Sequence, residues 1–413
     1  MGSFSTPLSG LVAAQDQLQS VSNNLANIDT DGYKDQTLTF SDIFSQTGAT
    51  NGSGNPLQTG YGVAVSSTDS NFTEGSLDAT GTASNMALSG NGFFVTQSAN
   101  GMPDYTRAGD FTSNSAGQLT TPSGELLLGY PAVGGVVNTT GALQPLNVGT
   151  GLTSLAVPST TIGITANLDA ASAVGTTASS SLPVYDSLGS PLTLSVTYTK
   201  TAANTWTYAV TVPSSDITGA TGTTTTVGSG TLNFSGAGAL TSTTAVVPIS
   251  IPTLADGAIS PLTLAGPFGT AANPTITQTA LASATSATTT DGYASGTLST
   301  YAVQPDGTIE GTFSSGNTIA LGQVAVASFA NTQGLASTGN NNYQPTAASG
   351  SAVIGLAGTA GRGTIVGGSV EESNVDIATE FAKLIVAQQA YSANAKSITT
   401  FNQVSQATIA MLQ

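Results

Sequence analysis

The C-terminal part of the chain contains apolar residues spaced seven apart, in the stretch IATEFAKLIVAQQAYSANAKSI at residues 377–398. This spacing predicts an amphipathic helix, which we expect over residues 374–412. Ser373 and Asp376 have the spacing of a capping box at its start. At ~1.5 Å per residue such a helix is about 60 Å long, so we expect it to project or to pair outside a compact core. One heptad position holds Ile377, Leu384, Tyr391, Ile398 and Leu412, and Phe381 flanks it.

The N-terminal part of the chain repeats this pattern. A helix is expected over residues 4–28, with Thr6 and Pro7 suited to its first turn. Its two apolar rows form an a/d heptad pattern, so we expect the two helices to pair as a coiled coil. Each could instead pack on its own domain. One row holds Phe4, Leu11, Leu18 and Leu25, and the other holds Pro7, Ala14, Val21 and Ile28.

The first predicted helix runs into a segment rich in Asn, Asp and Gly at residues 23–34. Asn and Gly tolerate left-handed backbone, and Asn, Asp and Thr side chains can bond free backbone groups. We therefore expect an ordered turn. Its candidate interface residues are Asn24, Asn27, Gly32 and Tyr33, although a purely structural turn would explain them equally well.

Between the two ends the apolar pattern changes to a period of two. Residues 192–198 and 206–212 alternate apolar and polar side chains around a short polar turn, which predicts a β-hairpin with one buried face. Runs rich in Thr, Ser, Gly and Ala are expected to be loops or a domain border, at 171–181, 217–230 and 282–290. Further strands are expected at 92–97, 126–130, 161–166, 231–235, 274–280, 297–303 and 319–329.

These patterns predict a mixed fold that is mainly β with α-helical termini. We expect a discontinuous β domain that carries an inserted β domain, with the N- and C-terminal helices paired as a coiled coil. The predicted divisions are 1–30 and 370–413 for the terminal helical coiled-coil domain, 31–84 and 336–369 for a connecting region, 85–164 and 286–335 for the discontinuous β domain, and 165–285 for the inserted outer β domain.

Charged side chains make up only 7% of the 413 residues. Six Lys and Arg stand against 22 Asp and Glu, for a net charge of −16, which would repel a phosphate backbone and an anionic membrane surface. We expect no nucleic-acid binding. Cys and His are both absent from the sequence, so we expect no disulfide, no metal site and no cofactor. We also expect no cleaved signal peptide and no membrane insertion.

These patterns are also compatible with an enzyme or with a secreted adhesin. An enzyme could use a carboxylate pair, such as Asp104 with Asp110 or Asp306 with Glu310. No nucleophile motif or phosphate loop accompanies these pairs, so we favour turn and surface roles and expect no catalytic residue. A secreted β-rich adhesin is the other alternative, but such a module would not need heptad helices at both ends.

Motifs at both ends resemble those of the axial proteins of the bacterial flagellum, the rod, hook and hook-associated proteins. They are LSGL at 8–11, NNLAN at 23–27, TDGYK at 30–34, SNVD at 373–376 and IVAQQAYSANAKSI at 385–398. Interior segments are similar to the β domain of hook and distal-rod proteins, namely GNGFFV at 90–95, YTRAGDF at 105–111, LGYPA at 128–132 and GQVAVASF at 322–329. Rod proteins lack so large an insertion as residues 165–285, so the hook proteins are the better match and a distal-rod protein is the alternative.

The resemblance implies an extracellular structural subunit of the flagellum, exported unfolded by the flagellar type III apparatus. It implies a homopolymer, a helical tube that couples rod to filament and transmits torque, with the terminal helices lining an inner tube. The implied partners are the rod, the hook cap and the hook–filament junction proteins. Each cation is then a candidate for contact with a neighbouring subunit, or else exposed and unpaired: Lys34, Arg107, Lys200, Arg362, Lys383 and Lys396.

Overall fold

A computed structural model describes residues 5–43, 46–50, 56–149, 151–245, 249–268 and 274–411. The chain forms two compact units. Unit 1 comprises Met1–Gly149, Tyr301–Gly311 and Ile319–Gln413, and unit 2 comprises Thr150–Thr300 and Thr312–Thr318. The structure is mainly β with one long helix toward each end of the chain, which confirms the predicted fold class.

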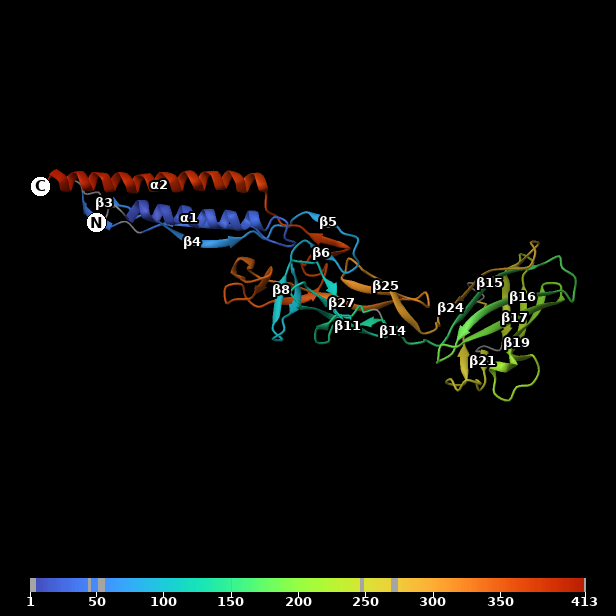
Figure 1. Cartoon of the computed structure of the whole chain (residues 1–413). Helices are drawn as coiled ribbons and strands as arrows, with labels where there is room; N and C mark the ends of the chain where they lie inside the picture. The colour runs from blue at the N-terminus through green and yellow to red at the C-terminus, as the bar shows by residue number, and fades with distance from the viewer. Residues whose placement is uncertain are drawn as a thin grey trace. The chain divides into compact units, whose positions relative to one another are not determined.

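The two helices lie side by side and antiparallel in unit 1 (Figure 1). Helix α1 spans Ser5–Ala26 and helix α2 spans Ile377–Met411, so both predicted helices are confirmed. The predicted capping box is wrong. Asp376 caps α2, because its Oδ1 accepts a hydrogen bond of 2.6 Å from the Thr379 amide, three residues into the helix. Two predicted heptad residues, Phe4 and Leu412, lie outside the described residues.

The main sheet of unit 1 is antiparallel and has a packed core on each face. Phe93 and Phe94 follow one another in a strand, so they point to opposite faces. Phe94 packs edge-on against Phe111 at 5.3 Å between ring centroids, and Phe93 packs against Tyr343 at 5.8 Å. The strand order is β27 (Thr318–Ser328), β11 (Leu126–Val133), β7 (Phe93–Gln97), β8 (Pro103–Thr106), β29 (Asn342–Gln344) and β28 (Ala336–Gly339).

Further strands, most of them short, complete this sheet, and two-stranded ribbons lead the chain toward the helices. Those attached to the sheet are β9 (Thr112–Ser113), β10 (Leu119–Thr120), β12 (Val136–Val137), β13 (Gln144–Pro145), β30 (Val353–Leu356), β26 (Thr308–Phe313) and β25 (Gly296–Val303). Two-stranded ribbons join β1 (Gln36–Asp42) to β4 (Val63–Ser70), β2 (Gln46–Thr50) to β3 (Pro56–Thr59), β5 (Leu77–Ala79) to β32 (Ser369–Glu371), and β6 (Met86–Ser89) to β31 (Thr364–Gly367). The last two ribbons bring the segment before α2 beside residues that follow α1. A short 3-10 turn, η2, covers Thr332–Gly334.

Unit 2 has its own core between two sheets. Alternate residues of the predicted hairpin face inward, and Trp206 is fully buried there beside Tyr198 and Tyr208. The larger sheet is antiparallel, in the order β16 (Thr177–Tyr185), β17 (Pro191–Ala202), β18 (Thr205–Pro213), β19 (Thr224–Phe234) and β20 (Leu240–Ala245). The smaller sheet has β15 (Ile162–Asp169) between β23 (Ile276–Thr279) and β24 (Ala284–Thr290). The remaining elements are β14 (Thr153–Ser154), η1 (Ser214–Asp216), β21 (Ile249–Ile251) and β22 (Leu262–Leu264).

All the predicted strands are confirmed, but the predicted loops are wrong in part. Strand β16 begins within the run at 171–181, β19 begins within 217–230, and β24 fills most of 282–290. Threonine is β-branched and suits a pleated strand, and these strands keep many polar side chains on the solvent face. These segments contain few apolar residues, so their sequences do not indicate strands. They form strands because they pair with neighbouring strands of the sheets.

Candidate functional site

The contact face between the helices is made of small and polar residues. Ala14 and Val21 of α1 are buried, and α2 buries Glu380 and Ala387. At Gly10 the two helices come close together, since a Cβ there would lie 2.9 Å from Asn394 Nδ2. Small residues thus let the backbones approach, and α2 meets α1 along a row formed by the buried Glu380 and Ala387 and the half-buried Asn394. This row differs from the apolar row that the sequence analysis assigned to packing.

The predicted packing residues consequently divide into three groups. Val21 is buried, and Leu11, Leu18, Leu25, Leu384 and Ile398 are half-buried. Three others are exposed on the outside of the pair, with exposed fractions of 51% for Ile377, 48% for Phe381 and 39% for Tyr391. The helix pair therefore leaves part of the predicted apolar row uncovered within one chain.

The helix pair carries further exposed apolar side chains, which are distributed around α2 and are not confined to one face of it. They are Leu8 and Val12 on α1, and Ile385, Val386, Phe401, Val404, Ile409 and Met411 on α2. The pairs Asn24 with Glu380 and Gly10 with Asn394 share one antiparallel register, which sets the start of α1 level with about residue 399. The last three turns of α2 thus extend beyond α1, and we call residues 400–411 the α2 overhang.

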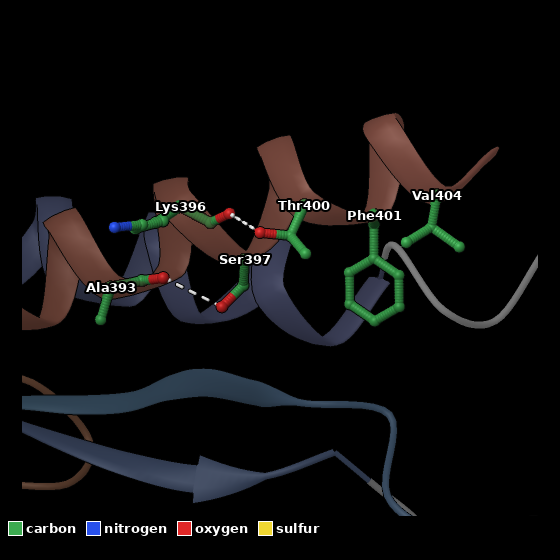
Figure 2. A pocket seen from close by; sticks show the side chains of 6 residues that line it. All are labelled: Ala393, Lys396, Ser397, Thr400, Phe401 and Val404. Atoms are coloured by element: carbon green, nitrogen blue, oxygen red, sulfur yellow. Dashed lines mark hydrogen bonds between the residues drawn. The ribbon is translucent and has the colours of Figure 1, made fainter. Parts of the chain in front are cut away.

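A groove of about 490 Å³ lies where this overhang begins (Figure 2). The hydroxyls of Ser397 and Thr400 do not project as free donors, because each bonds a carbonyl one turn earlier in the helix at 2.9 Å. The apolar surface of the groove comes from Phe401 and Val404, which project from the same side of α2 (Figure 2). The lining residues are Ala393, Lys396, Ser397, Thr400, Phe401 and Val404. This surface suits contact with another apolar side chain better than recognition of a polar ligand.

Asn24 joins the two helices to the chain that follows α1. Its carboxamide donates to Gln36 O at 2.9 Å and to Glu380 Oε2 at 3.1 Å. Its oxygen accepts from the Gln36 amide at 3.0 Å and from the Tyr33 hydroxyl at 3.1 Å. Burial, with the nearby carboxylates of Asp35 and Glu380, raises the pKa of Tyr33 to about 12, so Tyr33 remains a hydrogen-bond donor. Every hydrogen-bonding position of the buried Asn24 side chain is therefore used within the chain.

The turn after α1 is also held from within the chain. Asn27 Nδ2 donates to Asn23 O at 2.9 Å, and Asn27 Oδ1 accepts from the Thr30 hydroxyl at 3.2 Å. Gly32 has φ +69°, and a Cβ there would lie 2.5 Å from the Ala108 amide nitrogen. Both the backbone angle and the close approach require glycine at this position.

Glu371 forms the second buried connection, between the helix ends and the sheet of unit 1. Its Oε1 pairs with Lys34 Nζ and accepts the Gly75 amide at 3.0 Å, while its Oε2 lies 3.2 Å from Arg107 Nη1. The side chains of Lys34, Arg107 and Glu371 are 0–3% exposed. Burial lowers the pKa of Lys34, against the raising effect of the Glu371 charge. Arg107 also donates from Nη1 to Leu88 O at 3.0 Å and from Nη2 to Gly90 O at 2.6 Å, so both terminal nitrogens of its guanidinium have acceptors.

The sequence analysis missed Glu371 and Glu380. Lys34 and Arg107 were considered for contacts between subunits, but here both pair with Glu371 inside the chain, and Lys383 pairs with Glu380 at 2.6 Å. Lys200 and Arg362 donate hydrogen bonds to backbone carbonyls of the same chain. One signal could have pointed to these pairs. The sequence has only six cations in 413 residues, and Lys34 lies in the same motif as Gly32. A cation so close to a conformationally restricted glycine is a candidate for burial.

Three of the four carboxylates considered for catalysis, Asp104, Asp306 and Glu310, have structural partners. Asp104 Oδ1 accepts from Gln344 Nε2 at 2.8 Å, and Asp306 accepts from the Thr308 amide at 2.9 Å in a turn. Glu310 accepts from Gln304 Nε2 at 2.8 Å. Within the described ranges there is no group of three acidic side chains placed to hold a metal ion. No helix in the described part of the chain is both long and apolar enough to cross a membrane.

Comparison with protein families finds four matches, one at each end of the chain and two in its interior. Residues 4–34 match the flagella basal body rod protein family and residues 366–411 match the C-terminal family of flagellar basal body rod FlgEFG proteins. Residues 87–169 match the flagellar hook protein FlgE/F/G D1 domain, and residues 154–293 match the flagellar basal body protein FlaE D2 domain. The helix pair, its anchored turn and the two β regions are thus those of a flagellar axial protein.

Comparison with individual proteins narrows this class. The chain is 34% identical to the flagellar hook protein FlgE of Escherichia coli strain K12, over 97% of this chain and 98% of that protein. It is 33% identical to the flagellar hook protein FlgE of Rhizobium meliloti, over 98% and 97% respectively. A crystal structure of Helicobacter pylori flagellar hook protein FlgE2 shares the fold, with a TM-score of 0.51 and 16% identity over 70% of this chain and 98% of that one. The chain belongs to the flagellar hook protein family.

Membership of this family establishes the general role of the chain. Its relatives are structural proteins of the flagellar hook rather than enzymes. The chain is a structural subunit of the hook and a polymeric component of the flagellar axis. Its location is the extracellular part of the flagellum that is attached at the basal body.

Proposed function

We propose that copies of this chain polymerise through the exposed apolar face of the α1–α2 pair and form the wall of a tubular hook. The observation that carries this proposal is the uncovered apolar surface of α2, above all on the overhang, in a chain of a polymer-forming family. We infer that Ile377, Phe381 and Tyr391 contact neighbouring subunits directly. The other predicted interface residues support the helix pair and its turn: Leu11, Leu18, Val21, Leu25, Leu384, Ile398, Asn24, Asn27, Gly32 and Tyr33.

Burial of these exposed apolar side chains would contribute favourably to association. Fully burying a Val, Leu, Ile or Phe side chain contributes about 1.5–3 kcal/mol. Val404 and Ile409 are 58% and 56% exposed in the single chain. Covering four such half-exposed side chains gives about 4 kcal/mol per subunit, before the cost of ordering them is subtracted. Because each subunit of a helical tube has several neighbours, small contributions of this kind add up along the polymer.

Other parts of the predicted role also belong to the proposal. We infer export through the flagellar type III apparatus, and contacts with the rod, the hook cap and the hook–filament junction proteins at the two ends of the polymer. The hook proteins that this chain is similar to support these inferences. We further propose the predicted division into a coiled-coil domain, a connecting region, a discontinuous β domain and an inserted outer domain at 165–285.

A pair of matched variants tests the proposed polymer contact. Val404→Asp places a carboxylate on the apolar side of the overhang, where burial in an interface would cost several kcal/mol. Gln406→Asp adds the same charge two residues further along, about 200° around the helix. We expect secreted Val404→Asp subunits that fold but do not form hooks visible by electron microscopy, and normal hooks with Gln406→Asp. Hooks of normal length with Val404→Asp would contradict the proposal.

A further inference from the structure

Unit 2 contains a buried carboxyl group that the proposed assembly does not use. Asp186 begins the turn between β16 and β17 and is 1% exposed. Its Oδ1 accepts the amides of Leu188 at 2.8 Å and Ser190 at 2.9 Å. One oxygen of the carboxyl thus shapes the turn, in the manner of an Asx turn extended by a second bond.

The other oxygen of this carboxyl faces a second acid. Asp186 Oδ2 is buried and receives no hydrogen bond from any described N–H or O–H donor. The Asp186 side chain is instead in hydrogen-bond contact with the carboxyl of Asp256, which lies on an exposed segment between β21 and β22. Two ionised carboxylates in direct contact would repel one another. The contact is favourable only when a positive charge or a proton lies between them.

No cation of the described chain is placed to supply that charge. In unit 2 the ammonium of Lys200 is bound to Ala170 O at 2.6 Å and Ser172 O at 2.8 Å. The other ionisable groups on the elements around the pair are Tyr185, next to Asp186 in β16, and Asp216 in η1. Asp216 lines the same pocket of about 270 Å³ as Asp256, so it adds further negative charge to this region.

The segment that carries Asp256 is also attached to unit 2 by hydrogen bonds of its backbone. The Ile259 amide donates to Ser187 Oγ at 2.8 Å, in the turn that Asp186 shapes. The Ala255 amide donates to Asp216 O at 3.0 Å. Leu254 and Ala258, on either side of Asp256, are buried beneath the segment. The contact between the two carboxyls therefore lies where residues 254–260 close over residues 186–190.

We propose that Asp186 and Asp256 share one proton, and that this carboxylic acid–carboxylate hydrogen bond latches residues 254–260 onto the turn at 186–190. Removal of the proton leaves two facing carboxylates and loosens the segment. The latch makes the local stability of unit 2 depend on the pH of the medium around the hook.

The direction of this pH dependence follows from the environment of each acid. Burial, and then the contact with Asp256, raises the pKa of Asp186. The hydrogen bond from Asp186 lowers the pKa of Asp256, so that carboxylate stays ionised and accepts the shared proton. The closed segment binds the proton more tightly than an open one does. Closure is therefore favoured at low pH and is lost as the pH rises through the raised pKa of the pair.

Hydrogen exchange of the full-length monomer tests the latch. Amide protection in peptides covering 254–260 is measured by mass spectrometry from pH 3 to pH 9, after correction for the intrinsic exchange rate. We expect protection in the unaltered chain to fall by about ten-fold for each unit by which closure raises the pKa of the pair. Asp256→Asn places an amide donor against Asp186 and should give high protection that does not change with pH. Asp186→Asn should do the same from the other side, and Asp216→Asn should keep the pH dependence.

Three results would overturn the latch. The first is a flat protection profile in the unaltered chain. The second is a pH dependence that persists in Asp256→Asn, a substitution at an exposed position outside the core of unit 2. The third is a profile of the unaltered chain that about 1 mM CaCl2 makes independent of pH, since a bound divalent cation and not a proton would then close the pair.

Discussion

Replacing Glu371 by Ala tests the buried connection between the helix ends and the sheet of unit 1. The change removes the carboxylate that faces both Lys34 and Arg107 and leaves the two cations buried without a counter-charge. Breaking a buried ion pair by removing one partner costs about 3–5 kcal/mol. The Gly75 amide also loses its acceptor, which adds about 1–2 kcal/mol. The sum is a large part of the roughly 5–15 kcal/mol that stabilises a typical domain.

The chain offers an internal reference for this measurement. Its single Trp, Trp206, is buried in the core of unit 2, so Trp fluorescence during urea unfolding reports on unit 2. Circular dichroism at 222 nm follows the helices, which lie in unit 1. We expect Glu371→Ala to lower the midpoint of the helical transition strongly and to leave the fluorescence midpoint unchanged. Glu371→Gln, which keeps the volume and one acceptor oxygen, should lose less stability than Glu371→Ala.

A double-variant cycle isolates the charge pairing. Lys34→Met should cost less in the Glu371→Gln background than in the unaltered chain, because the charge that Lys34 neutralises is already gone. The reasoning would be refuted by a loss below about 1 kcal/mol for Glu371→Ala, a value typical of exposed ion pairs. An equal shift of the fluorescence midpoint would also refute it, since Glu371 lies in unit 1.

Three further changes have definite expected outcomes. Gly32→Ala should destabilise the helical transition by roughly 1–3 kcal/mol in urea, because φ is +69° and a Cβ would meet the Ala108 amide nitrogen at 2.5 Å; an effect near zero would mean that the turn can move. Asn24→Ala should cost about 2–3 kcal/mol in the same assay, since several buried hydrogen bonds lose their partner; Asn23→Ala, on the exposed side of the helix, is the control and should cost less. Asp291→Asn should flatten the acid dependence of the fluorescence transition. Burial raises the pKa of Asp291, but hydrogen bonds from Thr160 and Thr161 outweigh it and hold the pKa at about 2, so this carboxylate contributes stability that is lost as the pH falls from 3.8 toward 2; an unchanged acid profile would contradict that assignment.

The helices and strands could be predicted because the spacing of apolar residues along the sequence matches the period of each element. Heptad spacing gave α1 and α2, and strict alternation gave the hairpin of β17 and β18. The packing face of α2 could not be predicted from the same pattern. Apolar periodicity favours Ile377 and Tyr391, whereas the chain buries Glu380 and Ala387 and brings Asn394 against Gly10. α2 has one contact surface within the chain and a second one proposed between chains. Apolar periodicity in the sequence identifies only the more apolar of the two.

The buried ionic group shows a second limit of sequence reasoning. Lys34, Arg107 and Glu371 come from distant parts of the chain, and their pairing depends on the ribbon of β5 and β32 and on the close approach at Gly32. Local sequence patterns do not predict such a long-range contact. Charge type alone favours an exposed position for all three, because Lys, Arg and Glu are almost never fully buried unless they are paired.

Cysteine labelling of the α2 overhang tests the central claim most directly. The sequence contains no Cys, so Val404→Cys introduces the only thiol, at a position that is 58% exposed in the single chain. The rate of reaction with a soluble maleimide is measured in monomer and in assembled hooks. If the outer face of α2 is the polymer contact, labelling should be fast in the monomer and at least about ten-fold slower in the hook, as expected for a contact worth ~1.4 kcal/mol or more. Equal labelling rates in the two states would contradict the account.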